Sequence, residues 1–138
     1  MKIIMALFIC LIANCSMADS LYTGAWSYHP IPDKDVDHSS HNLIGYEHNT
    51  LLVAAYKNSY GKASLFVAKR LEFIDEPTWK AAVNVGINYG YYKCLRVDME
   101  EKTWCPAVVP EISYTKYKVQ PTLSLFGKAI VLAFKWEI

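Results

Sequence analysis

A histidine and a serine at the ends of two apolar segments are the residues of this sequence best suited to chemistry. His29 closes the segment 20–29, and Ser59 lies in the turn-forming run Asn58-Ser59-Tyr60-Gly61. If both segments end on the same rim of the fold, His29 can act as a base toward the Ser59 hydroxyl, which is then a nucleophile. The alternative is a histidine at a strand end and an ordinary turn, because the same residue types serve both purposes.

Two cysteines bracket a segment rich in charged and turn-forming residues. They are Cys94 and Cys105, and the sequence has neither a Cys-x-x-Cys motif nor a metal-ligand spacing around them. In an exported protein we expect them to form a disulfide, which stabilises the fold by about 3 kcal/mol when it closes so short a loop. A structural disulfide is therefore predicted, rather than redox chemistry.

An acidic segment could be taken for a cation site. Asp33 to His41 carries alternating aspartates, but His38 stands where a calcium loop requires glycine, and Ile44 stands where it requires a bidentate glutamate. His38 and His41 are a second candidate pair for a metal, and a solvated acidic loop is the alternative. We predict no metal and no cofactor.

The start of the chain predicts export. Lys2 precedes the apolar run Ile3 to Ala13, and Ser16-Met17-Ala18 is a small-residue cleavage pattern. The run is shorter than the roughly 20 residues that a membrane-spanning helix needs. We therefore expect residues 1–18 to be a signal peptide for Sec-type export and residues 19–138 to be one domain. Lipidation at Cys15 is an alternative.

Apolar residues in the remaining chain recur with period two, which is typical of strands. In Ala81 to Tyr92, valine, isoleucine and tyrosine alternate with asparagine and glycine. Breaks at turn formers give eight candidate strands: 20–29, 42–48, 51–58, 62–73, 79–92, 106–115, 118–126 and 128–138. Mostly short connections predict an all-β fold, an eight-stranded antiparallel up-and-down β-barrel.

The composition of the strand faces favours a barrel of outer-membrane type. The segment 81–92 contains no charge, and its small polar face suits a lumen while its apolar face suits lipid. In 62–73, adjacent Lys69 and Arg70 mean that one cation must face outward. A formal net charge of +1 offers no field for nucleic acid. A soluble periplasmic lipid-binding barrel is the alternative.

Several segments together resemble the outer-membrane lipid A palmitoyltransferases, the PagP family. Tyr56 to Lys62 resembles the family's Lys-Asp-Ser-aromatic turn, and Trp26 to His29 looks like the strand end that presents its essential histidine. Val83 to Gly90 and Cys105 to Pro110 are similar to its Gly-rich and Pro-flanked strands. The resemblance covers residues 26–138 and lacks the family's amphipathic N-terminal helix.

The resemblance implies a monomeric enzyme of the bacterial outer membrane. Its partners would be membrane lipids, because the family moves an acyl chain, usually palmitoyl, from a phospholipid to lipid A. The catalytic positions are occupied by His29, Asn58 and Ser59. Prolines cannot donate ladder hydrogen bonds, so Pro106, Pro110 and Pro121 would leave a lateral lipid gap between the sixth and seventh strands.

Two departures from the family pattern support a second hypothesis. Asn58 stands where the family has aspartate, and Arg70 stands where the family has an interior glycine that sets the depth of the acyl pocket. An amide cannot accept a proton, and a large cation would shorten the pocket, with Glu72 as its expected ion-pair partner. The second hypothesis is a catalytically silent envelope barrel that binds lipid or a surface partner.

Overall fold

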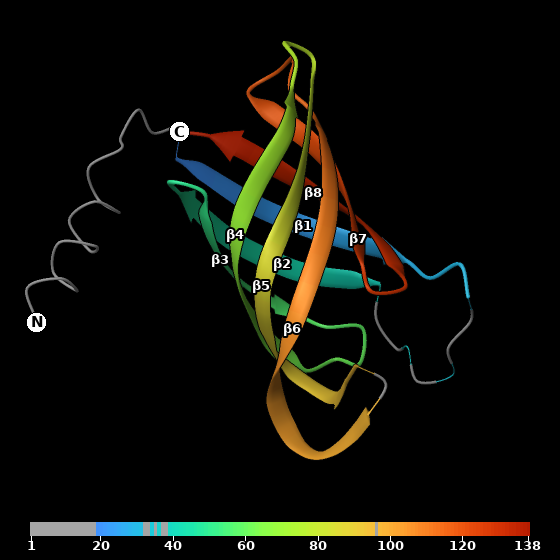
Figure 1. Cartoon of the computed structure of the whole chain (residues 1–138). Coiled ribbons are helices and arrows are strands. Elements are labelled where there is room, and N and C mark those ends of the chain that lie inside the picture. Colours follow the sequence, from blue (N-terminus) through green and yellow to red (C-terminus); the bar gives the residue numbers. More distant parts are fainter. Residues whose placement is uncertain (1–18, 32–33, 35, 37–38, 96) are drawn as a thin grey trace, which may run out of the picture.

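The computed structural model describes residues 19–31, 34, 36, 39–95 and 97–138. Eight antiparallel strands pair in chain order and close between β1 and β8, which confirms the predicted all-β barrel (Figure 1). The strands are β1 Ser20–Tyr28, β2 Ser40–His48, β3 Leu51–Lys57, β4 Ala63–Asp75, β5 Trp79–Cys94, β6 Val97–Tyr114, β7 Val119–Phe126 and β8 Ala129–Glu137.

Some of the predictions fall on residues that the structure does not describe. The expected signal peptide and Cys15 lie outside the described residues, as do Asp33, Asp35, Asp37 and His38 of the acidic segment. Within the described residues, no helix is long and apolar enough to cross a membrane.

The ends of the described chain lie at one end of the barrel, and four of the strand connections lie at the other. Ser20 pairs with Glu137, so the starts and ends of the described barrel meet at one end, which we call the terminal end. The connections β1–β2, β3–β4, β5–β6 and β7–β8 lie at the other, which we call the loop end (Figure 1). At the terminal end, hydrogen bonds from Tyr46 and His48 lower the pKa of Asp19.

The longest hairpin differs from the prediction. Residues 93–105 are rich in charge and turn formers and fall between the predicted strands 79–92 and 106–115, yet β6 begins at Val97. The ladder continues through Lys93↔Asp98 and Cys94↔Val97. Charged residues predict a loop because they are unfavourable in a strand that is buried on one face. This hairpin extends beyond the barrel wall, where both faces of β6 are exposed, so charged residues are tolerated there.

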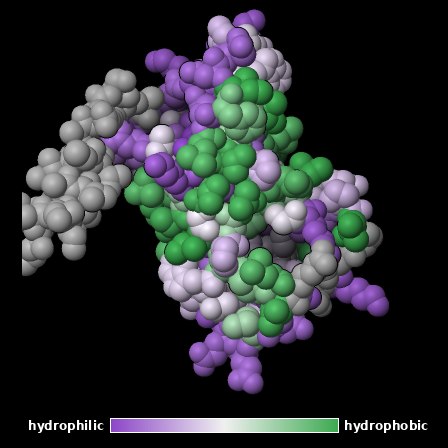
Figure 2. Space-filling model, in the orientation of Figure 1, coloured by the Kyte–Doolittle hydropathy of each residue, from purple (hydrophilic) through white to green (hydrophobic). Residues whose placement is uncertain are grey.

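The wall of the barrel is apolar outside, and its inward face carries polar side chains as well as apolar ones. On β5, Val85 and Ile87 face outward and are each 43% exposed, whereas Asn84 and Asn88 face inward and are buried. Outward residues of the same kind occur on the other strands, among them Leu21, Ile44, Val53, Val108, Leu123 and Ile130. Figure 2 shows hydrophobic side chains across the middle of the visible face and hydrophilic ones toward its two ends. Exposed apolar side chains therefore cover much of the outer wall.

The adjacent cations of β4 divide between the two faces. Lys69 is exposed and pairs with Leu51, the first residue of β3, so it lies at the level of the β2–β3 turn. Arg70 donates its backbone N–H to the oxygen of Thr50 in that turn, at 2.7 Å, and its side chain is buried in the interior. The outward cation is therefore placed near the terminal end of the barrel.

Arg70 is the centre of what we call the inner polar network. Its Nη1 contacts Glu111 of β6 in an ion pair whose two side chains are each 3% exposed, and it also donates to Tyr22 Oη at 3.2 Å. The expected partner, Glu72, lies 3.4 Å from Nη2 and is partly exposed. Glu111 is thus a closer partner than the one the sequence suggested.

The network continues across the lumen from Tyr22. Tyr22 Oη donates to Glu47 at 2.9 Å, and Lys135 Nζ donates to the other oxygen of Glu47 at 3.1 Å. Asn84 Nδ2 donates to Glu111 at 2.8 Å. These bonds join side chains from six strands, β1, β2, β4, β5, β6 and β8, and fill the interior of the terminal half. Each buried charge meets an opposite one, as burial requires.

A close approach between β4 and β5 depends on Gly86. A Cβ there would overlap the Val67 carbonyl oxygen and lie 2.5 Å from the Ala68 Cα, and backbone atoms cannot move aside cheaply. We expect Gly86→Ala to lower the free energy of unfolding by about 1–3 kcal/mol. Gly45→Ala is the control, because a Cβ at that position meets side chains at 3.1 Å or more. Urea unfolding in detergent measures both, and equal costs would contradict the explanation.

Candidate active site

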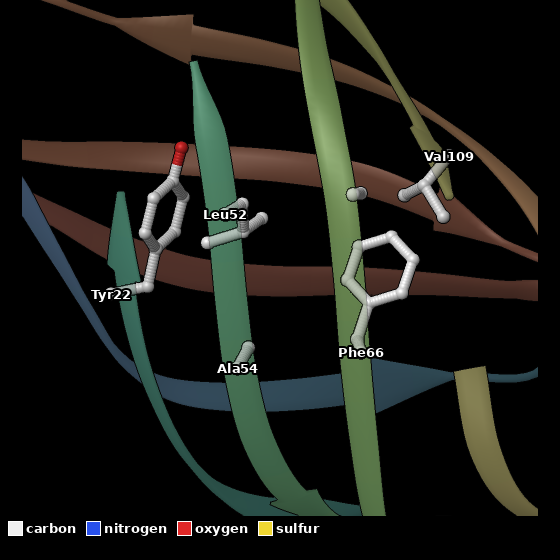
Figure 3. Packing of buried hydrophobic residues seen from close by; sticks show 6 residues of the cluster. Tyr22, Leu52, Ala54, Phe66 and Val109 are labelled. Atoms are coloured by element: carbon white, nitrogen blue, oxygen red, sulfur yellow. The ribbon is translucent and has the colours of Figure 1, made fainter. Parts of the chain in front are cut away.

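The loop half of the barrel contains a cavity of about 1230 Å³. Its wall is largely apolar: Leu52 and Ala54 of β3, Phe66 of β4 and Val109 of β6 point into the interior (Figure 3). Tyr22, Asn84 and Glu111 of the inner polar network also line the cavity, so this network forms its floor. The shape suits a flexible apolar group that enters from the loop end.

His29 and Ser59 meet at the mouth of this cavity. His29 directly follows β1, Ser59 lies in the β3–β4 turn, and both line the cavity. His29 Nε2 lies 3.0 Å from Ser59 Oγ, which is hydrogen-bond distance. The residues sit 30 positions apart in the chain. In this geometry the imidazole can take the hydroxyl proton as the oxygen attacks an electrophile.

Ser27 and His41, which the sequence did not identify as residues of this site, extend this pair. His41 Nδ1 lies 2.7 Å from the Lys57 carbonyl oxygen, which can only accept, so Nδ1 is the protonated nitrogen. In neutral His41, Nε2 then accepts the Ser27 hydroxyl proton at 2.6 Å. This leaves the lone pairs of Ser27 Oγ available to His29 Nε2, which is 3.3 Å away.

The consequence concerns His29 after it has taken a proton. A protonated Nε2 needs an acceptor, and Ser27 Oγ is oriented as one by its own bond to His41. Ser27 Oγ is therefore a neutral acceptor for the same nitrogen that contacts Ser59, whereas the carboxylate of a catalytic triad binds the other ring nitrogen of the base. A pattern signal existed for Ser27, two residues before His29 on the same strand face, but none for His41, which comes from β2.

Asn58 lies next to Ser59 in the chain, but its side chain points away from His29 and bonds to the turn and to β4 and β5. It is 1% exposed, and its Nδ2 donates to Ser64 Oγ at 3.0 Å and to the Gly90 carbonyl oxygen at 2.9 Å. Its Oδ1 accepts from the backbone N–H groups of Tyr60 and Lys62, both at 3.0 Å. None of these four bonds involves His29. Asn58 therefore shapes the turn that carries Ser59.

The turn itself follows from local sequence. The Asn58 backbone N–H donates to the Lys62 oxygen at 2.8 Å, and the Gly61 N–H donates to the Asn58 oxygen at 2.9 Å. Gly61 has a φ of 74°, a conformation in which glycine is unstrained. Asparagine accepting from backbone N–H groups farther along the chain is a standard turn device. Together they hold Ser59 between two fixed neighbours at the rim.

A disulfide holds the end of the β5–β6 hairpin over the loop end. Cys105 is buried beside the cavity and pairs with Asn88 in the ladder, yet it is bonded to Cys94, farther along β5. An extended strand would place Asn88 and Cys94 about 20 Å apart. The Cα atoms of the two cysteines are 5.5 Å apart, so the hairpin folds back, and Lys93 and Asp98 thereby reach the cavity lining. The predicted disulfide is confirmed.

β6 and β7 are paired over a short stretch only. The two strands pair only through Glu111↔Ser124, Ile112↔Leu123 and Ser113↔Thr122 in the described part of the chain. Toward the loop end, Leu125 and Phe126 still pair with β8, while β6 continues along β5. The β6–β7 ladder ends at Glu111, next to Pro110. Proline has no backbone N–H to donate, which favours an end of the ladder at this point.

The three prolines of the expected gap all lie in the outer wall. Pro106 and Pro110 are exposed on β6, and Pro121 is exposed on β7, where it pairs with Phe134 of β8. Pro110 adjoins the end of the β6–β7 ladder at Glu111. The gap between these strands as a path for lipid remains a prediction.

Nothing in the described residues groups three or more histidine, cysteine, aspartate or glutamate side chains in a way that could hold a metal ion. His41, one of the two histidines considered for a metal, bonds Ser27 and the Lys57 carbonyl oxygen. No protein-family model matches this chain, and no curated protein is significantly similar to it.

Proposed function

We propose that the chain is an outer-membrane acyltransferase of the kind that the PagP resemblance implies, moving an acyl chain from a phospholipid to lipid A. The observation that carries the proposal is the 3.0 Å contact between His29 Nε2 and Ser59 Oγ at the mouth of an apolar cavity. A nucleophile and its base lie where the carbonyl of a chain held in the cavity would emerge.

The proposed reaction has two halves. Ser59 Oγ attacks the ester carbonyl of the phospholipid, and His29 Nε2 takes the hydroxyl proton. The ester C–O bond breaks, the lysophospholipid oxygen takes the proton from His29, and the acyl group stays on Ser59. A hydroxyl of lipid A then attacks this acyl-serine while His29 again accepts its proton, which returns to Ser59 Oγ as the acyl group leaves. Ser27 Oγ, 3.3 Å from Nε2, stabilises the protonated imidazole in both halves.

The outer surface supports a membrane location. Apolar side chains such as Ile44, Val108 and Phe73, between 62% and 69% exposed, would be costly in water and are at home in lipid. In such an orientation the β6–β7 boundary would admit an acyl chain sideways from the bilayer. The exposed apolar wall is also the reason to prefer this proposal over a soluble periplasmic carrier.

Cationic side chains at the mouth support an anionic acceptor. Lys62 follows the β3–β4 turn, Lys93 is on the folded-back hairpin, and Lys128 is in the β7–β8 turn, and all three line the cavity. Ammonium groups attract phosphate as compact point charges. They would therefore orient a phosphate-bearing acceptor such as lipid A toward Ser59.

The test is the lipid A of cells that express the full chain. We expect a Gram-negative host without its own lipid A palmitoyltransferase to gain lipid A heavier by one acyl chain, measured by mass spectrometry against an empty-vector strain. Heat-modifiable gel migration of the same membranes establishes that the barrel is folded. A folded barrel with unchanged lipid A would contradict the transferase.

A second function is favoured by one observation. Asn58 replaces a carboxylate and uses both ends of its amide within the turn and its neighbours, so His29 has no charged partner among its described contacts. This favours a silent barrel that binds an acyl chain without transferring it. Unchanged lipid A together with copurified phospholipid would identify this function.

A further inference from the structure

Two buried asparagines of β5 line the apolar cavity. Asn84 and Asn88 are on the inward face of β5, 1% and 8% exposed, and both line the cavity. Within the described part of the chain, neither Oδ1 accepts a hydrogen bond. The ladder neighbours of Asn88 are Phe66 of β4 and Cys105 of β6, so the surroundings of its amide at this level are apolar.

These oxygens matter for what can fill the cavity. An unsubstituted acyl chain packed against Asn88 would leave its Oδ1 without a hydrogen bond, and a buried acceptor left unpaired is costly. A chain that carries a hydroxyl would donate to the oxygen instead. Sites that hydrogen-bond a ligand hydroxyl discriminate strongly against the analogue that lacks it, because the buried polar group is then left unpaired.

The level of Asn88 in the barrel indicates where the hydroxyl lies. Gly90 accepts from Asn58, so it lies at the level of the turn that carries Ser59. Asn88 is the next inward-facing residue of β5 toward the floor, and Asn84 lies about 13 Å farther along the strand. A chain whose carbonyl is at Ser59 would thus bring its first few carbons to Asn88.

We propose that the cavity selects acyl chains that are hydroxylated near the carbonyl, with a 3-hydroxyacyl chain as the fitting class and Asn88 as the residue that recognises it. The inference rests on the proposed function for the orientation of the chain. It does not require the protein to be catalytically active, because recognition precedes transfer.

The experiment compares two free acids on the full, folded barrel in detergent micelles. We expect 3-hydroxytetradecanoic acid to bind about tenfold more tightly than tetradecanoic acid, measured by titration calorimetry. Asn88→Leu, of similar size but without the amide, should remove the preference, and Ser124→Ala, which changes another cavity-lining polar side chain on β7, should keep it. Equal binding of the two acids to the wild type would overturn the proposal without reference to any variant.

A second experiment tests whether an esterified chain is recognised as the free acid is, and whether the proposed acyl transfer takes place. Mixed micelles of a phospholipid that carries either a 3-hydroxytetradecanoyl or a tetradecanoyl ester show whether an esterified chain is selected as the free acid is. A preference without transfer supports hydroxyl recognition and counts against the acyltransferase. Transfer with no preference between the two esters retains the acyltransferase and overturns hydroxyl recognition.

Discussion

If the proposed function holds, we expect acyl transfer to fall by roughly 100- to 10,000-fold when either Ser59 or His29 is replaced by alanine, because the proposed nucleophile or its base is then lost. Their 3.0 Å contact makes them one functional unit. We therefore expect the Ser59→Ala, His29→Ala double variant to be about as inactive as either single variant, since effects within a unit are not additive. The measurement is the rate of lipid A acylation in mixed micelles with purified, folded protein.

His48→Ala is the matched control for this result. His48 is exposed at the terminal end, where its Nδ1 contacts Asp19 Oδ1 at 2.7 Å, far from the cavity mouth. We expect its loss to leave acyl transfer unchanged. A Ser59→Ala variant that keeps wild-type transfer while folded would show that the hydroxyl is not the nucleophile, and the cavity would then belong to a binding protein.

We expect the free energy of unfolding to drop by about 3 kcal/mol when Glu111 is replaced by alanine, because buried Arg70 loses its closest counter-charge and keeps only the partly exposed Glu72, 3.4 Å from its Nη2. The side chains of Arg70 and Glu111 are each 3% exposed, so water cannot solvate the remaining cation without entering the packed terminal half. Urea unfolding of the barrel in detergent, followed by tryptophan fluorescence, measures the loss.

Two further variants separate the ion pair from general packing. The double variant Arg70→Met, Glu111→Leu removes both charges together, and we expect it to regain most of the lost stability, as replaced buried pairs do. Lys80→Ala removes a partly exposed ion-pair partner of Asp75 and should cost less than 1 kcal/mol. A double variant no better than Glu111→Ala would mean that shape rather than charge is decisive.

The sequence predicted the strands and their order well because each carries its own signal. Alternation of apolar and small polar residues in 81–92 marks a strand with unlike faces wherever it occurs. Short connections then leave a meander as the simplest topology, and eight strands of this length close into a barrel. The main error, residues 93–105, arose because a hairpin that leaves the barrel wall has the charged composition of a loop.

The site was predictable only in part, since contacts across the barrel leave no mark on local sequence. His29 and Ser59 could be paired because both fall at segment ends on the same rim. Glu111 could not be paired with Arg70, which is 41 residues away, and Glu72 was chosen for its proximity in the chain. His41 was considered only for a metal, because its approach to Ser27 depends on the β1–β2 register.

The inner polar network has a consequence for permeability. Its ion pairs lie across the lumen on the terminal side of the cavity, so charged side chains block the path from the cavity toward the terminal end. We therefore expect such a barrel to conduct no ions when it is reconstituted in a bilayer, and a ligand that enters at the loop end to leave there or through the proposed gap between β6 and β7. For the proposed acyltransferase, this would let an acyl chain enter the cavity without opening a path for ions across the membrane.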